Sequence, residues 1–159
     1  MSVAAEARIE VAFLEAWSRS GKKIELEKGD RFAHVAIRYQ NKWFHASPAN
    51  GAELVETFDL FGKTAKVTEI LVNENAPDLT ADEVRIFLGL PYDFKFVWNN
   101  SGGTYCSKLV AQLLAIAPVV MRFDGSYFAG IKNLPRGEPG ISPDGVHSEL
   151  LKRGYRVIQ

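Results

Sequence analysis

One cysteine and two histidines are the side chains of this sequence best suited to nucleophilic chemistry. Cys106 begins an apolar segment that continues at Leu109 and Leu113, a spacing typical of a helix, so its thiol is expected in the first helical turn. The unpaired backbone N–H groups and the helix dipole at that position favour the thiolate, which is the nucleophilic form of cysteine. A buried structural cysteine is the alternative interpretation, because free cysteines are often found in protein interiors.

His34 and His45 fall in two neighbouring segments that are rich in β-forming residues, 31–39 and 42–46. The two-residue connection Gln40-Asn41 predicts a tight hairpin, in which the alternation of side chains places both imidazoles on one face as diagonal neighbours. A loop one residue longer would turn His45 to the opposite face. A thiol and two imidazoles are together the groups of a nucleophile, a base and an orienting residue.

Two other interpretations use the same three residues. Taken singly, a histidine in a strand is more often structural than catalytic. Together with Cys106, His34 and His45 could also bind zinc, since cysteine and histidine are its preferred ligands. Such a site would have only three protein ligands and none of the close ligand spacings of zinc sites, so a catalytic thiol is favoured over a metal centre.

The elements that must position these residues predict an α+β fold, with a small antiparallel sheet packed against helices. Ile9, Phe13 and Trp17 recur every four residues, which predicts an amphipathic helix over residues 4–19. After the histidine hairpin, alternating side chains predict a third strand over 65–72.

Capping residues mark the later helices. Thr80 and Glu83 fit a capping box, whose helix is expected to end at Gly89. The remaining signals are Thr104 as the cap of the cysteine helix, Ser142-Pro143 at the start of a last helix, Gly154 at its end and a closing strand over 155–158.

Residues 118–141 mix proline, glycine and aromatic residues, which predicts a long ordered loop with a function or a short strand. Phe123, Tyr127 and Phe128 in this loop either line an apolar cleft or pack into the core. Both interpretations remain open from the sequence.

The chain has 159 residues, with 19 basic and 19 acidic side chains and no formal net charge. The length predicts one domain over 1–159, with residues 1–20 as an additional N-terminal helix. The neutral balance argues against a nucleic-acid partner, and no apolar run approaches the ~20 residues that span a bilayer. Because residues 1–20 lack an apolar signal core, a cytoplasmic location is expected, or a periplasmic one if a leader was removed. The oligomeric state is left open.

Three short motifs carry a resemblance to a known family. His34-Val35-Ala36-Ile37, Pro91-Tyr92-Asp93-Phe94 and Tyr105-Cys106-Ser107-Lys108-Leu109-Val110 resemble the YiiX-like proteins, which are circularly permuted relatives of the NlpC-type papain-like cysteine amidases. In the permuted order the histidine strand precedes the cysteine helix, as it does here. The two histidines followed by a distant cysteine are also similar to the lecithin:retinol acyltransferase-like branch. The resemblance covers roughly residues 24–158 and leaves the N-terminal helix unexplained.

The resemblance implies a Cys-His-His triad, with Cys106 as nucleophile, His34 as general base and His45 as the orienting residue. It also implies that Tyr92 supplies an oxyanion donor or a wall of the substrate cleft. Many permuted relatives have an acidic orienting residue, which makes Glu53 the alternative to His45. Lys108 departs from the family pattern, which has an acidic residue there.

The function that follows is that of a papain-like cysteine hydrolase, an amidase or peptidase that forms a thioester acyl-enzyme on Cys106 without a cofactor or metal. A peptide of the bacterial cell wall or a related amide is the expected substrate. The alternatives are lipid acyl transfer or deacylation, as in the acyltransferase-like branch, and a non-catalytic binding module that keeps the fold.

Overall fold

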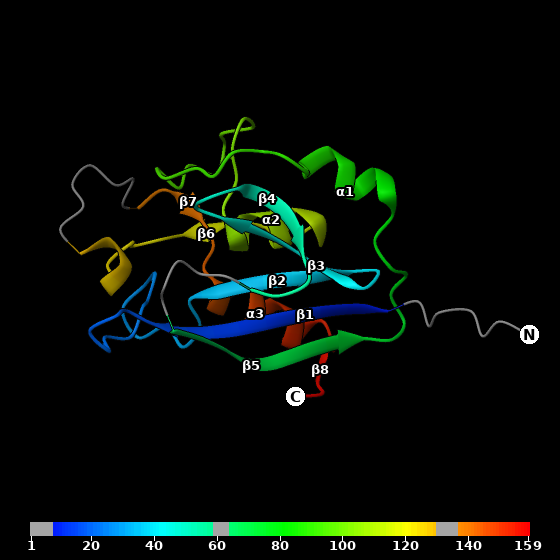
Figure 1. The fold of residues 1–159 in the computed structure, drawn as a ribbon, viewed down its shortest axis with the longest axis horizontal. Helices are drawn as coiled ribbons and strands as arrows, with labels where there is room; N and C mark the ends of the chain where they lie inside the picture. Colours follow the sequence, from blue (N-terminus) through cyan, green and yellow to red (C-terminus); the bar gives the residue numbers. More distant parts are fainter. Residues whose placement is uncertain (1–7, 59–63, 130–136) are drawn as a thin grey trace, which may run out of the picture.

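A computed structural model describes residues 8–58, 64–129 and 137–159 of the chain (Figure 1). Within these residues, six strands form one sheet whose neighbouring strands are antiparallel. In spatial order they are β4 (Gly51–Val55), β3 (Lys42–Ser47), β2 (His34–Tyr39), β1 (Ile9–Trp17), β5 (Thr64–Asn73) and β8 (Arg156–Val157). The other elements are α1 (Ala81–Phe87), α2 (Cys106–Leu113), α3 (Pro143–Lys152), the 3-10 turn η1 (Ser126–Phe128) and a small sheet of β6 (Val119–Val120) and β7 (Pro139–Gly140). The predicted α+β class is confirmed.

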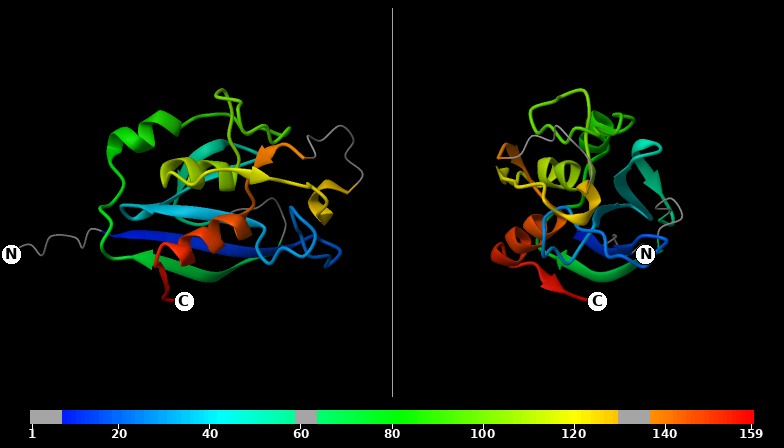
Figure 2. Two further views of the ribbon diagram at one scale, coloured as in Figure 1. Left: turned by 180° about the vertical axis from the view of Figure 1, so that it is seen from behind. Right: turned by 90° about the vertical axis from the view of Figure 1, so that its left-hand side faces the viewer.

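Helices α2 and α3 lie together on one side of the sheet (Figure 2). The core forms between these helices and the sheet. There, the fully buried Val35 and Ile37 of β2 belong to the same cluster as Leu109 of α2 and Val146 of α3. Burying these side chains is the main stabilising contribution of the layer, at about 1.5–3 kcal/mol for each large apolar side chain. The packing also sets the start of α2 against the sheet.

The N-terminal segment differs from its prediction. Residues 9–17 form the strand β1 between β2 and β5, so the helix expected over 4–19 is wrong; residues 1–7 lie outside the described part of the chain. A spacing of four residues fits a strand as well as a helix, because four is also a multiple of the strand period of two. Every residue from Ile9 to Leu14 is buried, as expected for a central strand that is covered on both faces. The additional helix assigned to residues 1–20 is therefore replaced, over 9–17, by a strand of the main sheet.

The histidine hairpin has the predicted register. Tyr39 pairs with Lys42 and Arg38 with Trp43, so the loop contains two residues, and Gln40 adopts the positive φ of 54° that such turns require. His34 and His45 therefore share one face of the hairpin.

Most of the predicted boundaries are also confirmed. The Thr80–Glu83 capping box is present at α1, and Ser142 caps α3 ahead of Pro143. β5 covers the strand expected over 65–72, and β8 forms 156–157 of the strand expected over 155–158. The exception is the cap of α2, which is Tyr105 and forms no side-chain capping bond. Thr104 instead pairs through its backbone with the Pro91–Asp93 segment.

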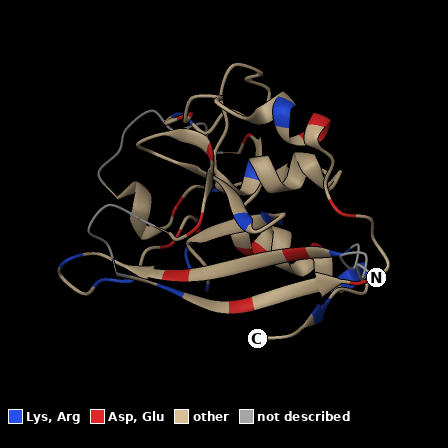
Figure 3. Ribbon diagram, turned by 45° about the vertical axis from the view of Figure 1, so that its right-hand side comes forward, with Lys and Arg blue, Asp and Glu red and all other residues tan. Residues whose placement is uncertain are grey.

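Acidic and basic side chains are interspersed along the strands and loops rather than separated by sign (Figure 3). Glu15 of β1, for example, pairs with both Lys23 and Arg31. No helix among the described residues has the length and apolarity needed to cross a membrane.

Gly51 provides a test of how β4 is held at the edge of the sheet. The next residue, Ala52, exchanges backbone hydrogen bonds with the Gly89–Leu90 segment, and a Cβ added at Gly51 would lie 2.1 Å from the Leu90 carbonyl oxygen. Gly51 and Gly89 both have positive φ, but a Cβ at Gly89 would meet nothing within 4 Å. We expect Gly89→Ala to cost about 1–2 kcal/mol of unfolding free energy through strain alone.

For Gly51→Ala we expect a further loss of about 1–3 kcal/mol, because the overlap with backbone atoms must also be relieved. Urea unfolding of both variants measures the difference. Equal losses in the two variants would show that β4 does not depend on this close approach.

Candidate active site

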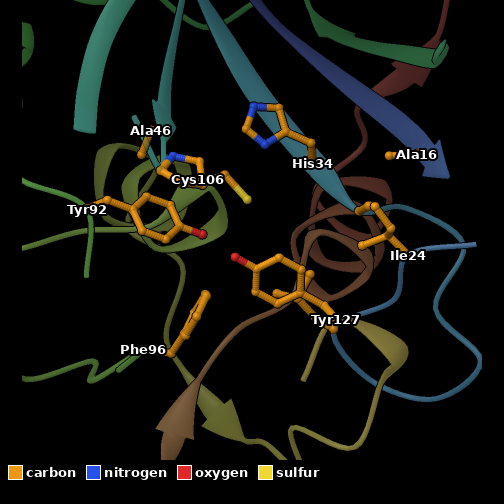
Figure 4. Close-up of a pocket in the computed structure, with 11 residues that line it drawn as sticks. Ala16, Ile24, His34, Ala46, Tyr92, Phe96, Cys106 and Tyr127 are labelled. Carbon is orange, nitrogen blue, oxygen red and sulfur yellow. The ribbon is translucent and has the colours of Figure 1, made fainter. Parts of the chain in front are cut away.

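Cys106 is the first residue of α2 and lies at the base of a pocket in the protein (Figure 4). Its side chain is 5% exposed. The pocket is lined by Ala16, Ile24, Leu26, Ala33, His34, Ala46, Pro48, Tyr92, Phe96, Cys106 and Tyr127. The thiol of Cys106 and the imidazole of His34 both point into it (Figure 4). The backbone N–H of Val35, the residue after His34, hydrogen-bonds the Cys106 sulfur, which brings β2 and the helix start together.

A chain of hydrogen bonds crosses three adjacent strands behind this thiol. His34 Nε2 of β2 is 2.8 Å from His45 Nδ1 of β3, and His45 Nε2 is 3.0 Å from Glu53 Oε1 of β4. His45 and Glu53 are cross-strand partners in the β3–β4 ladder, which explains why their side chains meet. The sequence offered His45 and Glu53 as alternatives, whereas the structure connects both of them to His34 in series.

The chain assigns the tautomers of both histidines. An ionised carboxylate can only accept, so His45 donates from Nε2 to Glu53 and carries its lone pair on Nδ1. His45 Nδ1 then accepts from His34 Nε2, which leaves the lone pair of His34 on Nδ1. Burial lowers the pKa of His45 against the opposing effect of Glu53, so this histidine is neutral at physiological pH. His34 Nδ1 is therefore the basic atom of the site.

Phe58 covers the two imidazoles. Its ring centroid is 6.2 Å from that of His34 and 5.6 Å from that of His45, in edge-to-face arrangements. An aromatic ring at this position limits the access of water to the hydrogen bond between the histidines and strengthens it by lowering the local dielectric.

The resting thiol is protonated. Burial raises the pKa of Cys106 to about 11, while backbone hydrogen bonds from Val35 and Ser107 oppose the rise. The helix start was expected to favour a thiolate, but removing the sulfur from water has the larger effect and reverses the expectation. A thiol in this state that acted as a nucleophile would have to lose its proton as it attacks, rather than before a substrate arrives.

Tyr92 and Tyr127 lie at the other side of the pocket, with their hydroxyl groups pointing toward each other (Figure 4). The two hydroxyls are hydrogen-bonded, and burial is the main cause that raises the pKa of each phenol. Tyr92 was predicted as a site residue. Tyr127 was expected only as one of several loop aromatics, and it lines the pocket, whereas Phe123 and Phe128 are buried in the second core cluster.

Lys108 holds the loop beside the pocket. Its buried ammonium group donates hydrogen bonds to the carbonyl oxygens of Val97, Asn100 and Gly103, at 3.2, 2.7 and 3.0 Å. This contact attaches the 97–103 loop to the helix that carries Cys106. The departure of Lys108 from the family pattern thus has a structural role, because an acidic side chain could not donate to carbonyl groups.

Metal binding is a separate question for these residues. In the described ranges, no group of three or more His, Cys, Asp and Glu side chains is placed to hold a metal ion. Both ring nitrogens of His45 are engaged in the chain from His34 to Glu53.

The strand that carries the histidine precedes the helix that carries the cysteine, and together they define a circularly permuted papain-like protein. A family model described as permuted papain-like amidase enzyme, YaeF/YiiX, C92 family, matches residues 22–123, and the chain belongs to this family. A comparison of folds matches the crystal structure of metalloprotein YiiX from Escherichia coli O157:H7, with a TM-score of 0.62 and 17% sequence identity over 94% of each chain. No curated protein matches the sequence.

The hydrogen-bonded chain predicts a graded series of variants. We expect His34→Ala to lower the rate of Cys106 acylation by at least about 10³-fold and His45→Ala by about 10²-fold, since one removes the base and the other only its orientation. Glu53→Gln is expected to cost about 10-fold, because the amide still bonds His45 but does not stabilise, through His45, the positive charge that forms on His34. Burst kinetics with an activated ester measure these rates.

Glu56→Gln is the matched control. Glu56 is an exposed residue directly after β4, so its substitution should leave the rate unchanged. Acylation of the His34→Ala variant at the wild-type rate would exclude His34 as the base.

The raised pKa predicts a slow thiol in the free protein. Iodoacetamide should alkylate Cys106 with a rate that keeps rising above pH 9 toward an inflection near 11, the value to which burial raises the pKa. The sign for stability follows, because the folded protein keeps a proton that the unfolded chain has lost between pH 9 and about 11. Stability should fall as the pH rises through this range, and less so in Cys106→Ala. An alkylation midpoint below pH 8 would contradict the assignment.

Proposed function

We propose that the protein is a cysteine hydrolase that cleaves an amide or ester through a thioester on Cys106. The observation that carries the proposal is the buried thiol that shares a pocket with His34, whose basic nitrogen is set by His45 and Glu53. A site in which a base is held in one tautomer beside a thiol is the arrangement that nucleophilic catalysis requires. Membership of a family of permuted papain-like amidases supports the same reaction class.

The reaction proceeds in two halves. His34 Nδ1 accepts the thiol proton as the Cys106 sulfur attacks the carbonyl carbon, and the tetrahedral intermediate collapses when His34 returns that proton to the leaving amine or alcohol. The product of this half is a thioester on Cys106. His34 then removes a proton from water, which attacks the thioester carbonyl, and the released sulfur takes up the proton as the carboxylic acid leaves.

The developing oxyanion needs hydrogen-bond donors. The backbone N–H of Cys106 lies at the start of α2, where helix N–H groups have no partner within the helix. The Tyr92 hydroxyl, across the pocket from the thiol, is the second donor in this proposal.

The lining of the pocket bears on the substrate. Apart from His34 and Cys106, the described side chains that line it are apolar or phenolic, with no Lys, Arg, Asp or Glu among them. A charged group would lose its hydration there without gaining an ionic partner from these lining residues. This lining favours an uncharged, apolar acyl group, as in the lipid-directed alternative. A peptide of the bacterial cell wall stays a candidate, with its charged groups outside the pocket.

A substrate panel tests the proposal. We expect p-nitrophenyl esters and N-acyl amides with acyl chains of four to eight carbons to be cleaved faster than their succinyl counterparts, by at least about 10-fold, because the charged chain must be desolvated. Muropeptides form the other arm of the panel. Mass spectrometry of the quenched enzyme should find the acyl group on Cys106, and Cys106→Ala should be inactive. Turnover that survives Cys106→Ala would overturn the function.

Ala33→Leu tests whether the acyl group occupies the pocket. Ala33 lines the pocket next to His34, so a larger side chain should shift the preference toward shorter acyl chains by about 10-fold. Ala81→Leu, on the exposed start of α1, is the matched control and should leave the preference unchanged. An unchanged preference in Ala33→Leu would place the acyl group elsewhere.

A further inference from the structure

The two phenols that face each other across the pocket are fixed by separate parts of the fold. Tyr92 lies in a parallel bridge with Thr104, in which Asp93 N donates to Thr104 O at 2.8 Å and Thr104 N donates to Pro91 O at 3.0 Å. Because Thr104 is two residues before Cys106, this bridge positions Tyr92 relative to the helix start. The Tyr92 ring is thereby tied to the nucleophile by backbone contacts.

Tyr127 is held by the other wall of the pocket. Its backbone N–H donates to Glu25 O at 2.9 Å, and the neighbouring Ser126 hydroxyl donates to Lys23 O at 2.6 Å. Gly125 permits this contact, since a Cβ there would lie 2.1 Å from the Glu25 carbonyl oxygen. Tyr127 is thus attached to the 23–26 segment, which contributes Ile24 and Leu26 to the same pocket.

Phe96 supports both rings. Its centroid is 5.9 Å from that of Tyr92 and 5.9 Å from that of Tyr127, with interplanar angles of 87° and 81°. Two rings that are braced edge-to-face by one buried phenylalanine keep their positions, so the adjustable part of each phenol is the hydroxyl hydrogen.

The two hydroxyls point toward each other in the free enzyme (Figure 4). A phenol hydroxyl can both donate and accept, so either one can supply the hydrogen of the bond between them. Tyr92 can therefore donate to a carbonyl group above Cys106 while it accepts from Tyr127.

We propose that Tyr127 is a positioning residue for catalysis, which acts by donating a hydrogen bond to the Tyr92 oxygen when the oxyanion forms. This inference rests on the proposed function. As negative charge develops on the carbonyl oxygen, the Tyr92 hydrogen turns to it and Tyr127 donates its own hydrogen to the Tyr92 oxygen. No covalent bond is broken, because each hydroxyl keeps its proton. A donor that itself accepts a hydrogen bond is polarised and binds the oxyanion more strongly.

Phenylalanine variants test the inference, because they remove only the hydroxyl groups. We expect Tyr92→Phe to lower kcat by about 10²-fold, as the loss of an oxyanion donor does, and Tyr127→Phe by about 10-fold. KM should change by less than about threefold in both, since the bond to the oxyanion forms only in the transition state. The double variant should have the kcat of Tyr92→Phe alone, because Tyr127 acts through Tyr92.

The controls separate this inference from the proposed function. Tyr39→Phe, on the distant β2–β3 turn, should leave kcat unchanged, and thermal melting checks that each variant folds. Wild-type turnover that survives Cys106→Ala would contradict the function itself. Cys106-dependent turnover with an unchanged kcat in Tyr127→Phe, a change in KM only, or losses that multiply in the double variant would overturn the role of Tyr127 alone.

Discussion

Three adjacent antiparallel strands share one chain of hydrogen bonds, from His34 on β2 through His45 on β3 to Glu53 on β4, and the chemistry of the site depends on it. A shift of one residue between any two of these strands would turn a member of the chain to the other face of the sheet. The ladder of backbone bonds therefore controls the tautomer of the base. This is why Gly51, which allows the β4 edge to approach Leu90, matters to a site that it does not touch.

Burial sets the protonation of the residues in the site. The same packing that raises the pKa of the Cys106 thiol to about 11 also lowers the pKa of His45, so the resting site holds a protonated thiol and an uncharged His45 imidazole. In the proposed reaction, charge separation is confined to the moment of attack, when the oxyanion and the protonated His34 stabilise each other in a medium of low dielectric. An apolar pocket suits this chemistry because it excludes water from the thioester until the leaving group departs.

The local structure was predictable from the sequence where a short segment determines its own geometry. The two-residue loop Gln40-Asn41 was enough to place both histidines on one face, and the Thr80–Glu83 capping box marked a helix start. The segment around Phe13 was not predictable in this way, because its four-residue spacing fits a strand as well as a helix. Its pairing with β2 and β5, which lie on either side of it, decided the outcome.

The sequence by itself determined which residues can react, namely one thiol and a pair of histidines in a hairpin of known register. The tertiary structure decided how they are connected. Glu53 joins the chain because β4 pairs with β3, and Tyr127 reaches Tyr92 because its turn docks on the 23–26 segment, about 100 residues earlier in the chain. It also decided the protonation of Cys106, because the exposure of a side chain depends on what the whole chain packs around it, and no local pattern of residues specifies that.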